Sequence, residues 1–347
     1  MSDATRGGSV CAWSWRAWRP LVIAAAMVAS LLAGWPLLTR LTDTLNARGF
    51  EEFRLPQRTD LPVAIAAAPD GAVWFTLESS DTIGRLQNGR VEKIPTGVQS
   101  LEPLGLAVDT DGNAWYTEAS KQRISRATPE GTIASFALST PVARLGRLRV
   151  GPDSSVWFAE PTVMSVTRLR DGRFTRHVMG TLDAKVPADA EPFGVAIAPD
   201  GAVWATLPSA DLLLRIAPDG STTAFEVPTR NSGLGDIAVA PNGVVYFIEM
   251  SANKIGRVVD GKIEEFLVPT PRAGLTALAV APDGAAWFTE LRGHRLGRLR
   301  EGTITEFELP RRDARPFGIT VDGANQVWYS DLSGWLGRLD AGRASGR

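Results

Sequence analysis

The chain has 347 residues, 44% of them hydrophobic, and its 37 Lys and Arg residues nearly balance its 38 Asp and Glu residues. This length supports a sizeable core, and a net charge near zero gives no reason to expect a nucleic-acid partner. The single cysteine, Cys11, excludes a disulfide framework and a cysteine-ligated metal site. With 34 Gly, 23 Pro and 11 Trp, the composition indicates many turns rather than long helices.

The N-terminal region predicts a membrane anchor. Pro20–Leu38 is uncharged, and as a helix it would span about 28 Å, close to one hydrocarbon core. Arg6, Arg16 and Arg19 precede it, which places the N-terminus in the cytoplasm and the rest of the chain outside it, on the periplasmic side. A cleaved signal peptide is the alternative, because the apolar run is short and rich in alanine. The expected segments are a cytoplasmic stretch (1–19), the anchor (20–39) and a linker (40–50).

A repeat with a period near 42 residues fills the remainder. Its clearest marker is an aromatic residue at Trp74, Trp115, Trp157, Trp204, Tyr246, Trp287 and Trp328. Each unit reads as four short strands with period-two alternation, separated by Asp-Gly or Asn-Gly turns. Four strands in about 40 residues describe a β-propeller blade, so seven units predict an all-β, seven-bladed propeller over residues 51–340, followed by a tail (341–347).

The two ends of the repeat predict how the ring closes. The last unit stops after "WLGRLD" without a fourth strand, whereas Glu51–Pro56 ("EEFRLP") matches the fourth strand "TEFELP" of the sixth unit. We therefore expect residues 51–56 to complete the seventh blade, which would leave no open sheet edge.

The innermost strands predict a central channel. Its lining positions hold mostly small residues, and the exceptions are Arg147, Arg149 and Asp236. Two arginines in such a channel would concentrate positive potential and bind a ligand. The alternative is that they plug the channel and pair with Asp236, since an unpaired buried charge is costly.

At "VWFTE", "ANKIGRVVDGKIEEFLVPTP" and "ARPFGIT" the repeats resemble the streptogramin B (virginiamycin B) lyases, over about residues 50–340. The resemblance implies a seven-bladed propeller that opens a cyclic depsipeptide by elimination. In that reaction a histidine is the base, and Mg²⁺ held by glutamates polarises the ester carbonyl.

The residues that the resemblance makes catalytic are mostly replaced here. The first histidine position is Thr276, and the Glu-Pro-His motif reads Arg315-Pro316-Phe317. Only Asp331 keeps the chemistry of the family's second glutamate. Glu102 and Glu118 in the second unit repeat the spacing of the two glutamates and are the candidate metal ligands, with Mg²⁺ as the candidate ion.

Three further features invite a functional interpretation. Glu160, Glu249 and Glu290 close the second strands of their units and suggest an acidic, ligand-binding rim, unless each carboxylate binds groups of its own blade. The strand-three arginines recur in every unit, which favours stacking on the aromatic residue over an anion site. The insertion within Met179–Ala190 is a candidate lid.

Two classes of function follow. The first is a monomeric, membrane-tethered propeller that binds a small molecule or a protein on its channel face; the missing histidines favour it. The alternative is a divergent Mg²⁺-assisted lyase, or a lactonase-like hydrolase, that uses carboxylates instead.

Overall fold

The computed structural model describes residues 49–57, 59–78, 80–100, 103–139 and 144–340. The chain divides into two units, residues 1–47 and 48–347, and the described residues belong to the second. Within them no helix is long and apolar enough to cross a membrane. The expected anchor at Pro20–Leu38 lies outside the described residues and stays a prediction.

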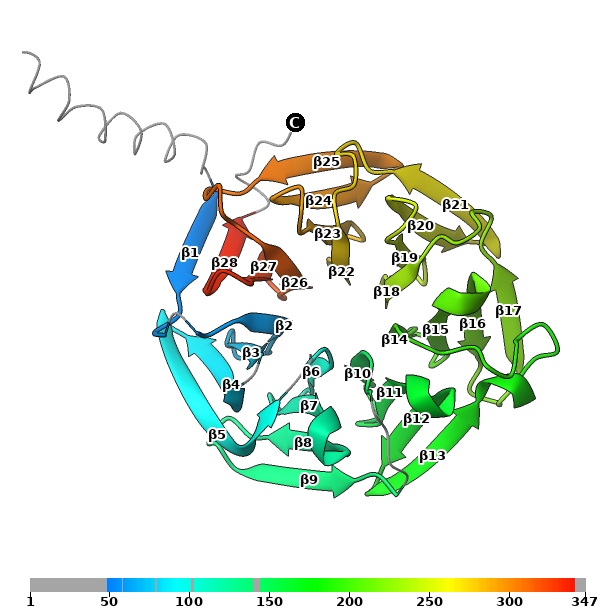
Figure 1. Ribbon diagram of the computed structural model, residues 1–347, viewed down its shortest axis with the longest axis horizontal. Coiled ribbons are helices and arrows are strands. Elements are labelled where there is room, and N and C mark those ends of the chain that lie inside the picture. The colour runs from blue at the N-terminus through cyan, green and yellow to red at the C-terminus, as the bar shows by residue number, and fades with distance from the viewer. Residues whose placement is uncertain (1–48, 58, 79, 101–102, 140–143, 341–347) are drawn as a thin grey trace, which may run out of the picture. The chain divides into compact units, whose positions relative to one another are not determined.

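Seven four-stranded antiparallel sheets form a ring, as the repeat predicts (Figure 1). The first four blades are, in order from the innermost strand, β2 (Pro62–Ala67), β3 (Val73–Leu77), β4 (Ser80–Gln87) and β5 (Arg90–Ser100); β6 (Leu106–Val108), β7 (Ala114–Glu118), β8 (Arg123–Ala127) and β9 (Ile133–Ala137); β10 (Leu148–Val150), β11 (Val156–Glu160), β12 (Ser165–Arg170) and β13 (Arg173–Val178); and β14 (Val195–Ile197), β15 (Val203–Leu207), β16 (Leu212–Ile216) and β17 (Thr222–Glu226).

The remaining three blades follow the same order. They are β18 (Leu234–Val239), β19 (Val245–Glu249), β20 (Lys254–Val259) and β21 (Lys262–Leu267); β22 (Leu275–Val280), β23 (Ala286–Glu290), β24 (Arg295–Arg300) and β25 (Thr303–Glu308); and β26 (Pro316–Val321), β27 (Gln326–Asp331), β28 (Trp335–Asp340) and β1 (Phe50–Arg54). Short 3-10 turns follow some second or fourth strands, namely η1 (Ala119–Lys121), η2 (Pro161–Val163), η3 (Met179–Thr181) and η4 (Pro208–Ala210).

The ring closes through the N-terminal strand, which confirms the prediction for residues 51–56 in its essential part. β1 pairs antiparallel with β28 along its whole length, from Phe50 opposite Leu339 to Arg54 opposite Trp335. The seventh blade therefore combines strands from both ends of the repeat region, with the N-terminal strand β1 at its outer edge.

Small residues allow close packing within a blade, and hydroxyls connect neighbouring blades. The ring of Phe247 lies over Gly256 on the next strand, where a Cβ would be 2.1 Å from the ring, so only glycine fits. The threonine that follows the "WF" pair bridges two blades: Thr289 Oγ1 donates to Phe317 O at 3.0 Å and accepts from Ala277 N at 3.0 Å. The equivalent hydroxyls of Thr76, Thr206 and Ser330 also donate to a backbone carbonyl of the next blade. These bonds fix the innermost strands around the axis.

Candidate functional site

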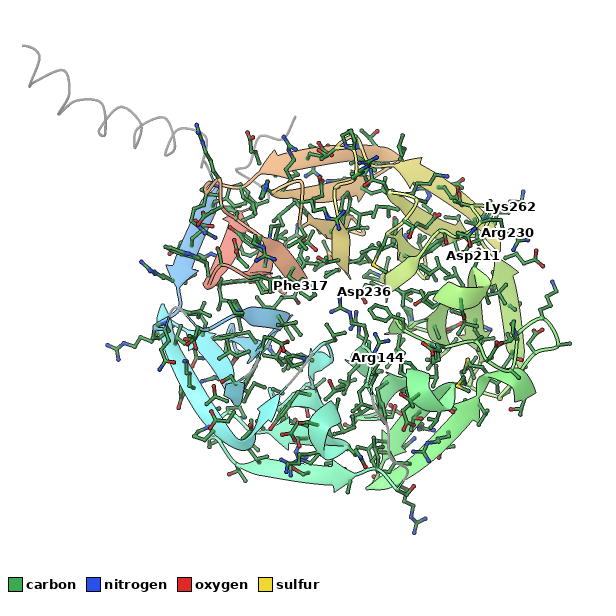
Figure 2. All side chains as sticks on the ribbon, viewed as in Figure 1. Arg144, Asp211, Arg230, Asp236, Lys262 and Phe317 are labelled. Atoms are coloured by element: carbon green, nitrogen blue, oxygen red, sulfur yellow. The ribbon has the colours of Figure 1, made fainter. Side chains whose placement is uncertain are left out.

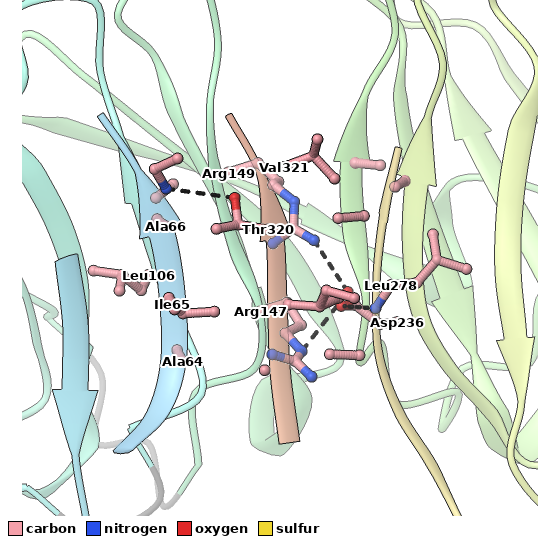
Figure 3. Close-up of a pocket in the computed structure, with 18 of the residues that line it drawn as sticks. Ala64, Ile65, Ala66, Leu106, Arg147, Arg149, Asp236, Leu278, Thr320 and Val321 are labelled. Atoms are coloured by element: carbon pink, nitrogen blue, oxygen red, sulfur yellow. Dashed lines mark hydrogen bonds and ion pairs between the residues drawn. The ribbon is translucent and has the colours of Figure 1, made fainter. Parts of the chain in front are cut away.

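The innermost strands enclose an axial cavity of about 330 Å³. Most of its lining residues are Ala, Gly, Val, Leu and Ile, as the alternation along strand one predicts. Arg147, Arg149 and Asp236 line the same cavity, and Thr320 is the other hydrogen-bonding side chain among the described lining residues (Figure 3). The three charged residues that the sequence singles out are thus brought together.

Arg147 closes the channel at the end where the first strands begin. It is only 5% exposed. Its Nη2 donates to Thr276 O at 2.9 Å, and its Nη1 donates to Leu104 O at 3.4 Å. These carbonyls belong to the sixth and second blades, so the guanidinium spans the channel between them. Burial, and secondarily the neighbouring Arg149, lower the pKa of Arg147, whereas Asp236 opposes this change.

Asp236 binds both arginines. Its Oδ1 accepts from Arg149 Nη2 at 3.1 Å and lies 3.7 Å from Arg147 Nε, while its Oδ2 accepts from Leu278 N at 3.2 Å. The aspartate is 2% exposed. The structure therefore shows the alternative in which both arginines pair with Asp236. The same carboxylate connects the third, fifth and sixth blades.

The positions of the family's histidines lie beside the same end of the channel. Thr276 and Phe317 are partly exposed and Arg315 is exposed, and Figure 2 shows Phe317 and Asp236 near the centre of the ring. The Thr276 hydroxyl donates to Phe317 O at 2.7 Å and lies 2.7 Å from Thr289 Oγ1. This hydroxyl is engaged in an interblade contact.

Asp331 occupies the position of the family's second glutamate and is fully buried. It forms an ion pair with Arg311, and its Oδ1 accepts from Ser333 N at 2.8 Å. Arg311 also binds Glu52 on β1, with Nε 3.0 Å from Oε2. Burial raises the pKa of Glu52, against the lowering effect of Arg311. The carboxylate of Asp331 therefore belongs to a network that locks the closing strand to its blade.

Glu118 and Glu160 are also bound within their own blades. Arg123 Nε lies 2.6 Å from Glu118 Oε2, and Arg176 Nε lies 2.9 Å from Glu160 Oε2. A hydroxyl of the adjacent strand, from Ser125 or Thr167, donates to each carboxylate. Glu102, the proposed partner of Glu118 in a metal site, lies outside the described residues, so that pairing stays a prediction.

Glu249 and Glu290 differ because they lack such a partner. Both are fully buried, and among the described residues neither carboxyl oxygen of either side chain has a hydrogen-bond partner. Burial raises the pKa of Glu249 to about 7 and that of Glu290 to about 8, and repulsion from Glu265 and Glu306 adds to these shifts. Glu160, Glu249 and Glu290 are buried inside their blades and do not form an exposed acidic rim, which was one of the two interpretations of these residues. Their role in ligand binding stays a prediction.

The strand-three arginines stack on the aromatic residues, as their repetition predicts. In five blades the guanidinium carbon lies 5.3–5.7 Å from the centroid of the marker tryptophan, in the pairs Arg85–Trp74, Arg126–Trp115, Arg168–Trp157, Arg298–Trp287 and Arg338–Trp328. Arg257 lies over Phe266 instead, at 5.0 Å.

The insertion between the third and fourth blades is not a lid. Met179, Val186 and Ala190 are buried in one cluster with residues of both blades. The Thr222 hydroxyl on β17 donates to Leu182 O, and β17 is the outermost strand of its blade in Figure 1. The insertion packs on the side of the ring because its apolar residues cover the outer strands there.

Sequence reasoning did not identify the basic residues that bind the closing acids. Arg176 on β13 and Arg311 in the linker before β26 are far from Glu160 and Asp331 in sequence. Their signal was available, because strand four carries Glu265, Glu306 and Glu52 at the position that Arg176 holds in the third blade. Aligning that position across blades separates Glu160, which faces an arginine, from Glu249 and Glu290, which face a glutamate. It does not identify the counter-ion of Asp331, because Arg311 comes from a linker.

These features define a seven-bladed propeller with a charged cluster on its axis and altered residues at the mouth of its channel. The model of the virginiamycin B lyase family matches residues 38–185 and 167–344. The chain belongs to this family, as the motifs in its repeats indicate.

Two curated relatives carry the name virginiamycin B lyase. The protein from Nocardia farcinica is 34% identical over 198 residues, which are 57% of this chain and 66% of that protein. The protein from Streptomyces coelicolor is 36% identical over 106 residues, which are 30% of this chain and 34% of that protein. The matched segments thus span less than two thirds of either relative.

Solved structures are similar to this chain over a larger share of its length. A catalytically inactive histidine-to-alanine variant of virginiamycin B lyase from Staphylococcus aureus, with quinupristin, matches with a TM-score of 0.77 and 27% identity over 84% of this chain and 99% of that chain. A streptogramin B lyase structure matches with the same TM-score and identity, over 84% of this chain and 97% of that chain.

The residues present do not fit the Mg²⁺ ion that the family resemblance implies. Arg315 places a cation where a carboxylate ligand is expected, and Asp331 is already paired with Arg311. A hard divalent cation requires several oxygen ligands that are free to bind it. We therefore assign no metal-dependent step to this face.

Proposed function

We propose that this chain is a ligand-binding propeller of the virginiamycin B lyase family that does not perform the lyase reaction. The observation that carries the proposal is the pair of side chains at the histidine positions. Thr276 and Phe317 supply no imidazole, and the Thr276 hydroxyl is bonded to its neighbours. A threonine hydroxyl in this setting cannot accept a proton at neutral pH as a histidine does.

The two histidines of the chain do not replace the missing base. His177 on β13 stacks on Trp157, with ring centroids 5.3 Å apart, and burial lowers its pKa. His294 Nδ1 contacts Ala314 O in a loop. The S. aureus neighbour that has lost one histidine is described as catalytically inactive, which supports the same conclusion for a chain that lacks an imidazole at both positions.

The proposal places the propeller outside the cytoplasm, held by a membrane anchor at Pro20–Leu38. The support is the uncharged run and the preceding arginines. Protease added to intact spheroplasts should remove the propeller. Full protection of the propeller would overturn this topology, and a mature protein that begins near residue 31 would replace the anchor with a signal peptide.

The test of the proposed function is a turnover assay with quinupristin and Mg²⁺, with the S. aureus enzyme as the positive control. General-base assistance is commonly worth about 10²–10⁴-fold in rate, so we expect no linearised product on the timescale at which the control is complete. Robust Mg²⁺-dependent turnover would overturn the proposal and favour the divergent lyase. Hydrolysis of a lactone without elimination would favour the hydrolase alternative.

A further inference from the structure

We propose that the axial cavity between Arg147, Arg149 and Asp236 binds a small monovalent anion, such as a carboxylate. This inference rests on the proposed function and specifies the class of ligand. It concerns the interior of the channel rather than the mouth where the family's catalytic residues lie. Its support is the uncancelled charge of the cavity, a buried N–H group without a hydrogen bond to the described residues, and a route of entry.

The charges that line the cavity do not cancel. Two guanidinium groups face one carboxylate, and the other described lining residues carry no titratable group. The carbonyls of Leu104, Thr276 and Ile237 accept hydrogen bonds from the arginines, but they supply dipoles rather than a full negative charge. A net positive charge with restricted access to water is costly, and a bound anion would offset that cost.

Arg147 has one donor, Nε, that forms an ion pair with Asp236 but no hydrogen bond within the described part of the chain. Its Nε is buried and has no hydrogen-bond partner among the described residues, and Asp236 Oδ1 lies 3.7 Å away, beyond normal hydrogen-bond reach. Arg147 as a whole is more than nine-tenths buried. Buried N–H groups almost always have a partner. Four strand-three arginines, Arg85, Arg126, Arg168 and Arg298, also leave Nε unbonded, but each stacks on a tryptophan. Arg147 faces the cavity instead, where a bound acceptor could reach its N–H.

Arg149 makes the cavity reachable from the other end of the channel. Its side chain is 27% exposed, whereas Arg147 spans the end near Leu104 and Thr276. A hollow of about 500 Å³ at the end with the Pro-Asp-Gly turns adjoins the cavity. The residues shared by the two spaces are Val150, Ile197, Val239, Val280 and Val321. An anion would enter past Asp322, whose carboxylate accepts from Gln326 N and Trp328 Nε1, and past these apolar side chains before it meets Arg149.

The size of the cavity restricts the ligand. About 330 Å³ corresponds to roughly ten water molecules at about 30 Å³ each. Acetate or formate with a few waters fits this space, whereas a nucleotide or a depsipeptide does not. Thr320 is a further hydrogen-bonding group on the wall (Figure 3), and the net charge matches a monovalent ligand.

The experiment is a calorimetric titration of sodium acetate into the purified full-length protein in chloride-free buffer. We expect saturable binding that Arg149→Gln weakens at least tenfold, because this change removes the excess charge and leaves Arg147 paired with Asp236. Asp236→Asn should strengthen binding, because two arginines would then face no carboxylate. Arg170→Gln, which removes an arginine outside the channel in the same blade, should change nothing.

Titrations with chloride and phosphate identify the kind of anion. Acetate binding that competes with chloride supports a general monovalent-anion site, and binding confined to acetate supports a carboxylate site. The absence of saturable binding for all three anions, or equal binding by wild type and a folded Arg149→Gln variant, would overturn the anion site. The quinupristin assay would remain negative in that case, so the two proposals fail separately.

Discussion

The acids that close the second strands differ sharply between two groups of blades. In the second, third and seventh blades Glu118, Glu160 and Asp331 each pair with an arginine. In the fifth and sixth blades Glu249 and Glu290 occupy the same position, equally buried, without a hydrogen-bond partner.

The residue on strand four explains the difference between the third blade and the fifth and sixth blades. In the seventh blade this residue is also an acid, Glu52, but Arg311 from the preceding linker binds both Glu52 and Asp331. In the third blade this residue is Arg176, which binds Glu160 directly. In the fifth blade it is Glu265, which attracts Lys254 at 2.7 Å and leaves Glu249 unpaired. In the fifth and sixth blades the second acid at this position leaves the closing acid without a counter-ion, and burial then raises its pKa. The paired acids are bound to arginines, and Glu249 and Glu290 are fully buried, so neither group offers an accessible free carboxylate to a metal ion.

The largest expected effect is a decrease in stability with rising pH that comes from Glu249 and Glu290. Their folded-state pKa values, about 7 and about 8, lie above the ordinary value of 4.5. Their contribution to stability is thus complete below about pH 4.5 and is lost as pH rises through 7 and 8. The slope approaches a limit of about 1.4 kcal/mol per pH unit for each group.

Urea unfolding between pH 5 and pH 9 measures this slope. The double variant Glu249→Gln/Glu290→Gln should flatten it, and Glu160→Gln should leave it in place. Infrared spectra at pH 6 should show a protonated-carboxyl band that the double variant loses. Identical slopes for wild type and the double variant would show that both acids find partners in solution.

The next largest effect is expected where the closing acid is paired with an arginine, at Glu160. Arg176→Ala removes the counter-ion of a fully buried carboxylate, and the free energy of unfolding should fall by about 3 kcal/mol. Arg176 is itself one-quarter exposed, which keeps the loss below the largest values known for buried pairs. Chemical denaturation at pH 7 checks the value.

The fourth blade supplies the control for this change. In the fourth blade Leu207 and Ala224 occupy the positions that Glu160 and Arg176 hold in the third blade. The double variant Glu160→Leu/Arg176→Ala therefore gives the third blade the residues that the fourth blade has. The double variant should recover most of the lost stability, to within about 1 kcal/mol of wild type. A double variant as unstable as Arg176→Ala alone would show that lost packing, rather than an unpaired charge, causes the defect.

The smallest effect is expected at an exposed pair. Arg300 Nη1 lies 3.5 Å from Asp283 Oδ2, and the Arg300 side chain is 52% exposed. Arg300→Gln should change stability by less than about 0.5 kcal/mol, because water and salt screen the charges. A loss comparable with that of Arg176→Ala would contradict the assignment of the large effect to burial.

The sequence was sufficient for the architecture because the period of the aromatic residues and the turn signals are local. It also predicted the closure, since Glu51–Pro56 copies a fourth strand. The unpaired state of Glu249 and Glu290 was not predicted, because it depends on Glu265 and Glu306 two strands away, and this pattern is visible only when strand four is aligned blade by blade. Likewise, the channel arginines were visible as exceptions, but their contacts with Leu104 and Thr276 come from blades on either side of the axis.

The central claim is that no closing acid is available as a metal ligand, and a titration with Mn²⁺ as a substitute for Mg²⁺ tests it most directly. Electron paramagnetic resonance reports free Mn²⁺ without requiring a substrate. We predict no saturable binding at pH 7 by the full-length protein, and no difference between wild type and Asp331→Asn. One equivalent of bound Mn²⁺ that is lost in Asp331→Asn or Glu118→Gln would contradict the account.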